Sequence, residues 1–391
     1  MPPAASRPFH LMIKPAGPAC NLACAYCYYL EKASHYPGSS LRMGDETLAR
    51  VTAAYLQANP APEVVFGWQG GEPLLAGLEF FRRAVELQAQ HARPGQRAVN
   101  ALQTNATLVT DEWAAFFVEH DFLVGISVDG PPELHDRYRL DRAGHPTYGR
   151  AVAGLRVLQR HGVECNALVA VNRANAEHPL AVYRHLTGLG FQHLQFIPVV
   201  ERQSPAARKV TPWSVRPEAF AAFLCEIFDH WARTDVDRVF VQLFESALSV
   251  WSGGLPTVCV FAPACGSALA VEHNGDLYAC DHFVSPEYLR GQVALDALGS
   301  LVEGNDQRAF GLAKAHLPEQ CRRCPVRRFC GGDCPKHRLR LAQDGQPISY
   351  LCASYRTFFT HSAQVLEAMA QELRAGRPAA NVMRALNDTG H

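Results

Sequence analysis

The sequence has no excess of charge of either sign. Among its 391 residues, Lys plus Arg and Asp plus Glu each number 37, so the formal net charge is zero. Such a balance gives no bulk electrostatic attraction to nucleic acid or to an acidic membrane surface. We therefore expect neither nucleic acid nor a membrane among the partners of this chain.

The sequence also has no long hydrophobic run. Its first residues, MPPAASRPFHLMIKPAG, contain no apolar stretch of signal-peptide length, and no later run approaches the length needed to span a bilayer. We therefore expect a cytoplasmic chain. Its length is sufficient for two domains, or for one large domain with an appendix, and for a sizeable buried core.

Cysteine, by contrast, is abundant. The 13 cysteines are an odd number that excludes complete pairing, and clustered cysteines in a reducing compartment are more often metal ligands than disulfides. Eleven of them fall into two spacing patterns: Cys20, Cys24 and Cys27, then Cys259, Cys265, Cys280, Cys321, Cys324, Cys330, Cys334 and Cys352. The other two, Cys165 and Cys225, lie on apolar segments and are predicted to be buried structural thiols.

The number of thiolates in each pattern indicates its chemistry. Three thiolates leave one iron of a cubane cluster without a protein ligand, whereas eight can close two four-ligand sites. The first pattern therefore predicts reaction at the metal, and the second predicts electron storage or a structural role.

Strand-like and helix-like segments alternate from residue 9 to about residue 235. Strands are expected at 9–14, 63–68, 98–103, 122–128, 164–171 and 193–198. Helices are expected near 45–58, 77–91, 111–119, 148–161, 176–188 and 217–233, with Asp45 and Thr110 at N-cap positions. These β-then-α units predict an α/β fold with parallel strands, either a partial (β/α)6 barrel or an open doubly wound sheet.

Polar motifs follow the predicted strands. Cys20–Cys27 follows the first strand, Gly70-Gly71-Glu72-Pro73 follows the second, Asn105 follows the third, and Ser127 closes the fourth. Parallel α/β folds place their chemistry at these carboxyl ends.

The regular alternation stops at about residue 250. Cysteine, proline and glycine then occur at close intervals up to residue 352, which predicts irregular backbone held by metal rather than by a large apolar core. A helical pattern returns at 353–373. We predict three domains, comprising a barrel at 1–240, a cysteine-rich domain at 241–360 and a helical tail at 361–391.

The first cysteine motif is specific. A zinc site would normally have four ligands, and no fourth Cys or His lies at a suitable local spacing. The stretch Cys-Asn-Leu-Ala-Cys-Ala-Tyr-Cys at 20–27 resembles the radical S-adenosylmethionine (SAM) enzymes. In that family SAM chelates the open iron of a 4Fe–4S cluster, and reduction of the cluster releases a 5′-deoxyadenosyl radical.

The same resemblance implies a SAM-binding set. Gly70, Gly71 and Glu72 look like the family's GGEP motif, whose backbone and acidic side chain hold the methionine amino group. Ser127 and Arg139 match positions that contact the SAM ribose and carboxylate, although each is also compatible with an ordinary polar loop residue. Tyr26 matches an adenine contact, or else packs as a loop aromatic on the cluster.

The second cysteine set resembles the SPASM domain, the auxiliary-cluster extension of peptide-modifying radical SAM enzymes. The resemblance implies two further 4Fe–4S clusters, one bound by Cys259, Cys265, Cys280 and Cys334 and the other by Cys321, Cys324, Cys330 and Cys352. Spacing alone does not fix this partition, and a zinc ribbon remains an alternative for the C-x2-C pairs because thiolates also suit zinc.

Within the SPASM group, the chain looks closest to the anaerobic sulfatase-maturating enzymes. The resemblance extends through the segments 9–15, 27–32, 195–198 and 280–284. It implies removal of a Cβ hydrogen from a Cys or Ser of a sulfatase peptide, followed by loss of a proton and an electron to give Cα-formylglycine. Asp281 matches the family's proposed base; alternatively, it caps a turn or pairs with an arginine.

Two other interpretations stay open. One is another SPASM peptide maturase that forms thioether or carbon–carbon crosslinks in a ribosomal peptide. The other is a non-enzymatic iron–sulfur or zinc scaffold for a partner protein, against which the open-coordination triad and the GGEP motif argue. For the enzyme, the expected partners are an unfolded or nascent sulfatase chain and an electron donor such as flavodoxin or ferredoxin.

Overall fold

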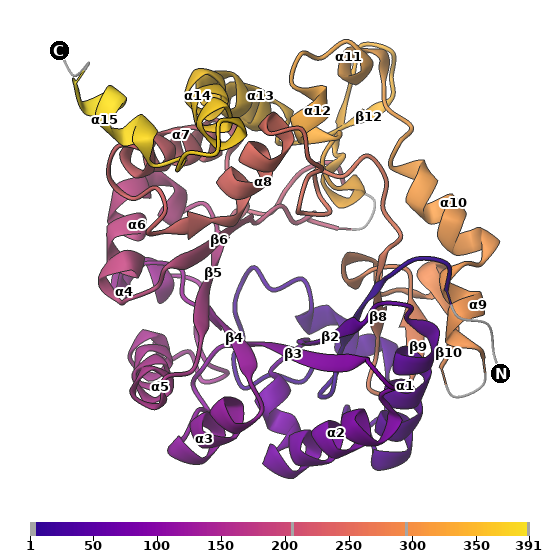
Figure 1. The fold of residues 1–391 in the computed structure, drawn as a ribbon. Coiled ribbons are helices and arrows are strands. Elements are labelled where there is room, and N and C mark those ends of the chain that lie inside the picture. Colours follow the sequence, from indigo (N-terminus) through magenta and orange to yellow (C-terminus); the bar gives the residue numbers. More distant parts are fainter. Residues whose placement is uncertain (1–4, 205–206, 294–295, 389–391) are drawn as a thin grey trace. The chain divides into compact units, whose positions relative to one another are not determined.

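The structure is a computed structural model, and it describes residues 5–204, 207–293 and 296–388. The chain divides into two compact units. The first unit comprises residues 1–127, 139–165 and 265–313, and the second comprises 128–138, 166–264 and 314–391. Each unit therefore combines segments that are distant in the sequence (Figure 1).

The first unit is built on seven strands in the order β10-β9-β8-β1-β2-β3-β4. Strands β1 to β4 are parallel, β8 is parallel to β1, and β9 is antiparallel to both β8 and β10. Their bounds are β1 His10–Ile13, β2 Glu63–Trp68, β3 Arg97–Thr104, β4 Phe122–Ser127, β8 Ala268–Val271, β9 Asp276–Tyr278 and β10 Leu289–Gln292.

Helices α1, α2 and α3 lie along one side of strands β2 to β4 (Figure 1). Their apolar residues recur at helical spacing, so that α1 buries Leu48, Val51, Tyr55 and Leu56 on one face. The helices of this unit are α1 Asp45–Ala58, α2 Leu78–His91, α3 Asp111–Glu119, α5 Tyr148–His161, α9 Leu298–Val302 and α10 Asn305–Ala313.

The second unit has three parallel strands in the order β5-β6-β7 and a set of helices. The strands are β5 Cys165–Val171, β6 His193–Pro198 and β7 Phe240–Val241, and a separate hairpin pairs β11 Arg340–Leu341 with β12 Pro347–Ile348. The helices are α4 Pro132–His135, α6 Pro179–Gly188, α7 Pro217–Thr234, α8 Gln242–Trp251, α11 Glu319–Arg322, α12 Arg327–Cys330, α13 Cys352–His361, α14 Ala363–Arg374 and α15 Asn381–Asp388.

The predicted strands and helices of residues 9–234 are confirmed to within three residues, with two local corrections. Thr110 caps α3 by accepting a hydrogen bond from the Trp113 N–H, as expected. Asp45 is instead the first residue of α1, and the N-cap is Gly44, which offers no side chain to the helix. The expected helix at 176–188 begins at Pro179, after a short 3-10 turn.

Three expectations for the cysteines and the later residues need correction. The segment after residue 250 is not irregular throughout, because β8, β9 and β10 extend the sheet of the first unit. The helical pattern at 353–373 forms two helices, α13 and α14, which meet at Ser362. Cys165 and Cys225 are half-buried rather than fully buried.

The domain boundaries at residues 240 and 360 stay a prediction.

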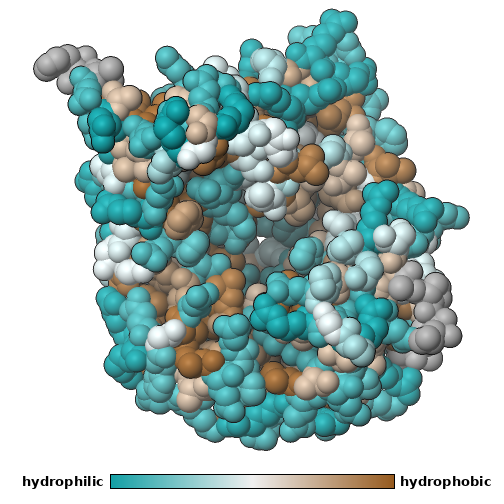
Figure 2. Space-filling view, in the orientation of Figure 1, coloured by the Kyte–Doolittle hydropathy of each residue, from teal (hydrophilic) through white to brown (hydrophobic). Residues whose placement is uncertain are grey.

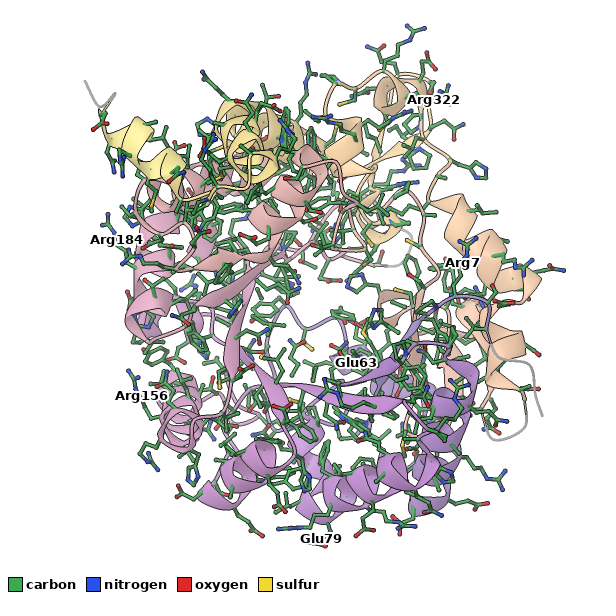
Figure 3. The ribbon with its side chains drawn as sticks, viewed as in Figure 1. Arg7, Glu63, Glu79, Arg156, Arg184 and Arg322 are labelled. Carbon is green, nitrogen blue, oxygen red and sulfur yellow. The ribbon has the colours of Figure 1, made fainter. Side chains whose placement is uncertain are left out.

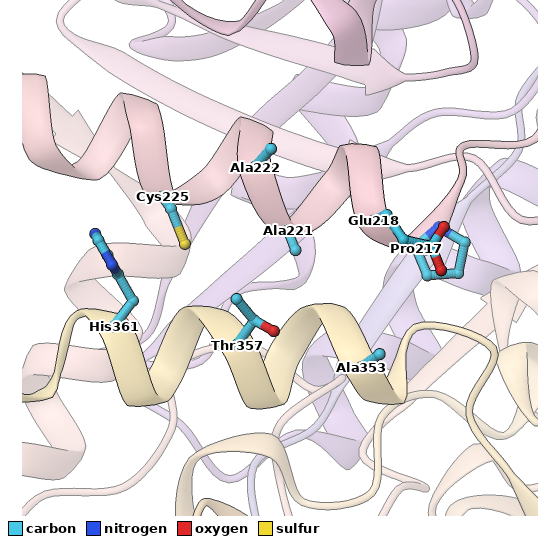
Figure 4. A pocket seen from close by; sticks show the side chains of 8 residues that line it. All are labelled: Pro217, Glu218, Ala221, Ala222, Cys225, Ala353, Thr357 and His361. Carbon is cyan, nitrogen blue, oxygen red and sulfur yellow. The ribbon is translucent and has the colours of Figure 1, made fainter.

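A groove of about 460 Å³ lies between α7 and α13 of the second unit (Figure 4). It is lined by Pro217, Glu218, Ala221, Ala222, Cys225, Ala353, Thr357 and His361. None of the predicted site residues lines this groove, so it is not the candidate active site.

Candidate active site

The first cysteine motif lies on a loop that the chain anchors at two places. The Ala23 N–H donates to the Leu140 carbonyl at 2.9 Å, and the Arg142 Nε–H donates to the Cys20 carbonyl at 2.7 Å. Both anchors come from the segment before α5. The loop that carries the triad is therefore held by the fold of the first unit itself.

The three thiols of this loop are close enough to act on one another. Burial, together with the negative charges of Glu72, Cys24 and Cys27, raises the pKa of Cys20 to about 12, although a hydrogen bond from the Leu22 N–H opposes the increase. Thiolates that repel one another in this way are stabilised by a cationic group bound among them. The donor set therefore fits an iron–sulfur cluster.

Hydrogen bonds to sulfur are also in place. Cys20 Sγ accepts from the Leu22 N–H at 3.4 Å and from the Asn105 Nδ2–H at 3.8 Å. Donors to the ligating sulfur are among the groups that set the potential of an iron–sulfur cluster. Asn105, at the end of β3, is thereby a neighbour of the cluster loop.

The Gly-Gly turn packs directly against the start of the cysteine loop. The Gly71 N–H donates to the Gly17 carbonyl and the Glu72 N–H donates to the Ala19 carbonyl, both at 2.8 Å. A Cβ on Gly71 would lie 1.9 Å from the Ala19 oxygen, and Gly70 has a φ of +136°. Only glycine fits this close approach of two backbones.

The carboxylate of Glu72 accepts hydrogen bonds from other residues of the protein. It is fully buried and accepts hydrogen bonds from the Leu74 N–H at 3.1 Å, Thr104 Oγ1 at 2.7 Å and the Asn105 N–H at 2.8 Å. Burial raises its pKa, and these hydrogen bonds and the charge of Arg139 oppose the increase. Glu72 thus joins the ends of β2 and β3, a bracing role that the sequence did not predict.

The other predicted SAM-contact residues also belong to the first unit. Arg139 is buried and its Nη1 donates to Tyr26 Oη at 2.8 Å, so the arginine is fixed to the cysteine loop. Ser127 is buried at the carboxyl end of β4. Their contacts with SAM stay a prediction.

Asp281 lies between a lysine and a tyrosine. Its carboxylate forms a buried ion pair with Lys14, at the end of β1, and accepts a hydrogen bond from Tyr28 Oη. Burial would raise the pKa of Asp281, but the charges of Lys14 and His282 and the two hydrogen bonds hold it at about 2. Asp281 is therefore ionised, and its cation is a lysine rather than the arginine that we considered.

Tyr28 connects Asp281 to both cysteine sets. The tyrosine follows Cys27 directly, and burial, Asp281, Cys27 and Cys280 together keep its pKa well above its usual value. Neither Tyr28 nor Lys14 was predicted from the sequence. Two features of the sequence could have identified them: Tyr28 directly follows a predicted ligand cysteine, and Lys14 directly follows a strand.

Four cysteines of the second set come together in the second unit. Burial, with the charges of Asp333, Cys352 and Cys321, raises the pKa of Cys330 to about 12. Burial, with the charges of Cys352 and Cys324, raises the pKa of Cys321 to about 11. The four thiols are thus within electrostatic reach of one another. This grouping agrees with the predicted distal cluster.

A buried aspartate, Asp333, holds the segment of Cys334 to the segment of Cys352. Its Oδ2 accepts from Ser349 Oγ at 2.6 Å and lies 3.0 Å from Nδ1 of His337. Ser349 Oγ in turn accepts from the Leu351 N–H at 2.9 Å. Asp333 adopts a left-handed φ of +58°, which an aspartate tolerates better than most residues. This residue was not predicted from the sequence.

The remaining four cysteines belong to different units, with Cys265 and Cys280 in the first and Cys259 and Cys334 in the second. Their predicted sharing of one cluster stays a prediction.

Within the described ranges, no group of three or more His, Cys, Asp or Glu side chains is arranged to hold a single metal ion. Among the helices of the same ranges, none is long and apolar enough to cross a bilayer.

Comparison with protein families identifies two matching regions. The radical SAM superfamily matches residues 15–186, and the SPASM iron–sulfur cluster-binding domain matches residues 259–325. The predicted fold class, a radical SAM α/β domain followed by a cysteine-rich SPASM domain, is confirmed. The implied cofactors, SAM and 4Fe–4S clusters, follow from the same matches.

Comparison with individual proteins gives matches over nearly the whole chain. A serine-type anaerobic sulfatase-maturating enzyme of Bacteroides thetaiotaomicron is 42% identical over 98% of this chain and 96% of that protein. A cysteine-type anaerobic sulfatase-maturating enzyme of Clostridium perfringens is 32% identical over 94% of this chain and all of that protein. The solved structure of native anSMEcpe with bound AdoMet and Cp18Cys peptide has a TM-score of 0.85, with 32% identity over 95% of this chain and all of that one.

Proposed function

The chain belongs to the anaerobic sulfatase-maturating enzymes of the radical SAM superfamily, and we infer that it oxidises a Cys or Ser of a sulfatase peptide to Cα-formylglycine. One observation in the site supports this reaction. A buried carboxylate, Asp281, is held by Tyr28 beside Cys27 of the radical-forming loop and directly follows Cys280 of the second set. The reaction needs a base close to the place where hydrogen is abstracted.

Each group of the site then has a distinct task. Cys20, Cys24 and Cys27 would hold the cluster that, together with SAM, would supply the radical for removal of one Cβ hydrogen atom. The substrate must also lose one proton and one electron to become the thioaldehyde or aldehyde. We propose that Asp281 accepts the proton, and the cysteines of the second set would hold the 4Fe–4S clusters that would supply an acceptor for the electron.

Lys14 and Tyr28 prepare Asp281 for this task. The Lys14 ammonium keeps the carboxylate ionised and so free of a proton, and the same charge lowers its affinity for one. The same two contacts fix the position of the carboxyl group, and geometry is the first requirement of a general base. The proposed base is thus positioned from two sides.

The choice between Cys and Ser is open to direct test. The serine-type relative from Bacteroides is 42% identical and the cysteine-type relative from Clostridium is 32% identical. This difference supports a serine-containing sulfatase peptide as the first substrate to try. A cysteine peptide of otherwise identical sequence is the matched comparison.

The decisive experiment is an anaerobic assay of the reconstituted enzyme with SAM, reductant and the two peptides. Mass spectrometry is expected to show formylglycine, formed with an equal amount of 5′-deoxyadenosine. Asp281→Asn is expected to retain SAM cleavage and lose the aldehyde. Normal SAM cleavage without aldehyde from either peptide would contradict the sulfatase assignment, and a crosslinked product would favour another SPASM maturase.

We further propose an electron donor such as flavodoxin or ferredoxin, a cytoplasmic location and no nucleic-acid partner. The balanced overall charge and the need for a strong reductant support these proposals. Cell fractionation tests the location, and reconstitution with each carrier in place of a chemical reductant tests the donor.

A further inference from the structure

Positive charge is concentrated in the distal cysteine segment. Residues 319–356 contain eight Lys and Arg but only three Asp and Glu, although the two kinds are equal in the whole chain. The basic residues are Arg322, Arg323, Arg327, Arg328, Lys336, Arg338, Arg340 and Arg356, and the acidic ones are Glu319, Asp333 and Asp344. The segment therefore carries a local excess of five positive charges in a chain of zero net charge.

Most of these arginines are exposed on the second unit. Arg328 lies over the ring of Trp251, and we call the other five exposed ones the arginine cluster: Arg322, Arg323, Arg327, Arg340 and Arg356. Figure 3 labels Arg322, which projects outward from α11. Figure 2 shows a hydrophilic surface over the part where Figure 1 places α11. The charges are therefore presented to solvent.

Few acidic side chains neutralise the arginine cluster. Arg322 and Arg323 share one carboxylate, that of Glu319, at 2.5 Å and 2.6 Å. Arg327 and Arg356 form no ion pair with any residue of the described ranges. Much of the positive charge thus stays available for a partner.

The arginine cluster surrounds the four distal cysteines. Arg322 and Arg323 lie between Cys321 and Cys324 in the sequence, and Arg327 is three residues from Cys330. Cys352 is the first residue of α13, and Arg356 follows it by four residues, one turn further along the same face of the helix. A molecule bound to these arginines would therefore lie against the thiols predicted to hold the distal cluster.

We propose that the arginine cluster is the docking surface for an acidic electron-carrier protein. Complementary charge speeds the encounter of two proteins and orients them without requiring a large interface. Complexes of electron-transfer proteins bury little surface, typically below about 1,200 Å². A set of exposed arginines around redox-active ligands matches such a partner, and the proposal rests on the iron–sulfur function proposed above.

A nucleic acid fits this surface less well. Proteins that bind single strands present aromatic faces on which bases stack. Here Arg328 lies 4.4 Å from the ring centre of Trp251, and Arg340 lies 5.0 Å from that of Tyr350, so that guanidinium groups already cover these two rings. The exposed chemistry is positive charge, which suits a carboxylate-rich protein.

The test measures binding rather than turnover. Fluorescently labelled flavodoxin, an acidic carrier, is titrated with the full-length reconstituted enzyme at low and at high salt. The wild-type affinity is expected to fall about tenfold or more as added salt shortens the screening length. An affinity that does not change with salt would overturn the proposal, and this result needs no variant.

Charge reversal then locates the surface. Arg327→Glu with Arg356→Glu is expected to weaken flavodoxin binding about tenfold or more at low salt, with a smaller difference at high salt. The matched control is Arg156→Glu with Arg184→Glu, which makes the same charge change at two exposed helical arginines labelled in Figure 3. Iron content and thermal melting of each variant confirm that it is folded.

Two further results would overturn the proposal. One is an equal loss of binding in the control pair, which would indicate a general charge effect. The other is tighter binding of a single-stranded DNA oligonucleotide than of flavodoxin at the same arginines. A separate assay of the wild type with reduced methyl viologen distinguishes failure of docking from failure of the proposed function, because this small reductant needs no docking surface.

Discussion

At the scale of single residues, the site depends on buried contacts between side chains that are distant in sequence. Asp281 pairs with Lys14, whose side chain is 1% exposed, and Glu72 accepts from three donors, one in the turn after β2 and two at the end of β3. Removal of one member of such a pair lowers the free energy of unfolding, because the other member stays buried without a partner for its charge or hydrogen bond.

Lys14→Met is expected to destabilise the enzyme by about 3–5 kcal/mol, because it leaves the Asp281 carboxylate buried without its cation. Urea unfolding measures this cost. The matched comparison is Lys14→Met combined with Asp281→Asn, which removes both charges and is expected to recover much of the loss. Strictly additive effects would show that the two side chains do not interact.

Gly71→Ala is expected to abolish SAM cleavage, because its Cβ would overlap the Ala19 carbonyl and push the turn away from the cysteine loop. Gly149→Ala is the control. Gly149 lies in α5, where an added methyl group would meet open space, and alanine there is expected to stabilise the helix by about 0.5–1 kcal/mol. 5′-Deoxyadenosine formation and thermal melting measure the two outcomes, and normal cleavage by Gly71→Ala would contradict this role.

At the scale of elements, the sequence predicted the chain up to residue 234 better than the chain after it. The helices and strands up to residue 234 were predictable because apolar residues repeat at the period of each element, as in α1. The strands β8, β9 and β10 were missed because they are only three or four residues long and lie among cysteines and glycines. Of these strands, β8 is specified by its pairing with β1, a long-range contact that local pattern does not contain.

The candidate site shows the same limit. The cysteines were predicted as ligands from their spacing, and Asp281 as the base from its place beside Cys280. Lys14 and Asp333 were not, since each acts through a partner brought to it by the fold. Spacing reports local ligand geometry, whereas a buried ion pair joins residues that the sequence separates.

Ser349→Ala is expected to destabilise the segment that carries Cys352 and so to impair its binding of iron. The hydroxyl donates to Asp333 and accepts from the Leu351 N–H, so its loss leaves buried polar groups unpaired at a cost of about 1–3 kcal/mol. Iron analysis after reconstitution is expected to fall from about twelve to about eight atoms per chain, because one of three four-iron clusters is lost.

Ser252→Ala is the control for this experiment, since the Ser252 hydroxyl is buried with no hydrogen-bond partner among the described residues. Its iron content is expected to stay at the wild-type value. Full iron content in Ser349→Ala would show that Asp333 does not organise the distal ligands.

At the scale of the whole molecule, the clusters are expected to contribute folding energy. Residues 319–352 form only short helices and a hairpin whose two strands have two residues each. Segments with so little regular structure depend on bound metal for their order. Removal of iron by a chelator is therefore expected to raise amide hydrogen exchange across 319–352 much more than in α1, α2 and α3. Uniform protection before and after chelation would contradict this role of the clusters.

The pairing of β1 with β8 also has a consequence for biosynthesis. Leu11 lies opposite Leu269, so one edge of β1 stays uncovered on the ribosome until the strand at 268–271 has emerged. An unpaired strand edge is prone to wrong association while the chain is still growing. Asp281 emerges shortly after this strand and reaches Lys14 only then. A nascent polypeptide that ends before residue 281 therefore carries the cysteine loop without the proposed base, and the candidate site becomes complete only late in translation.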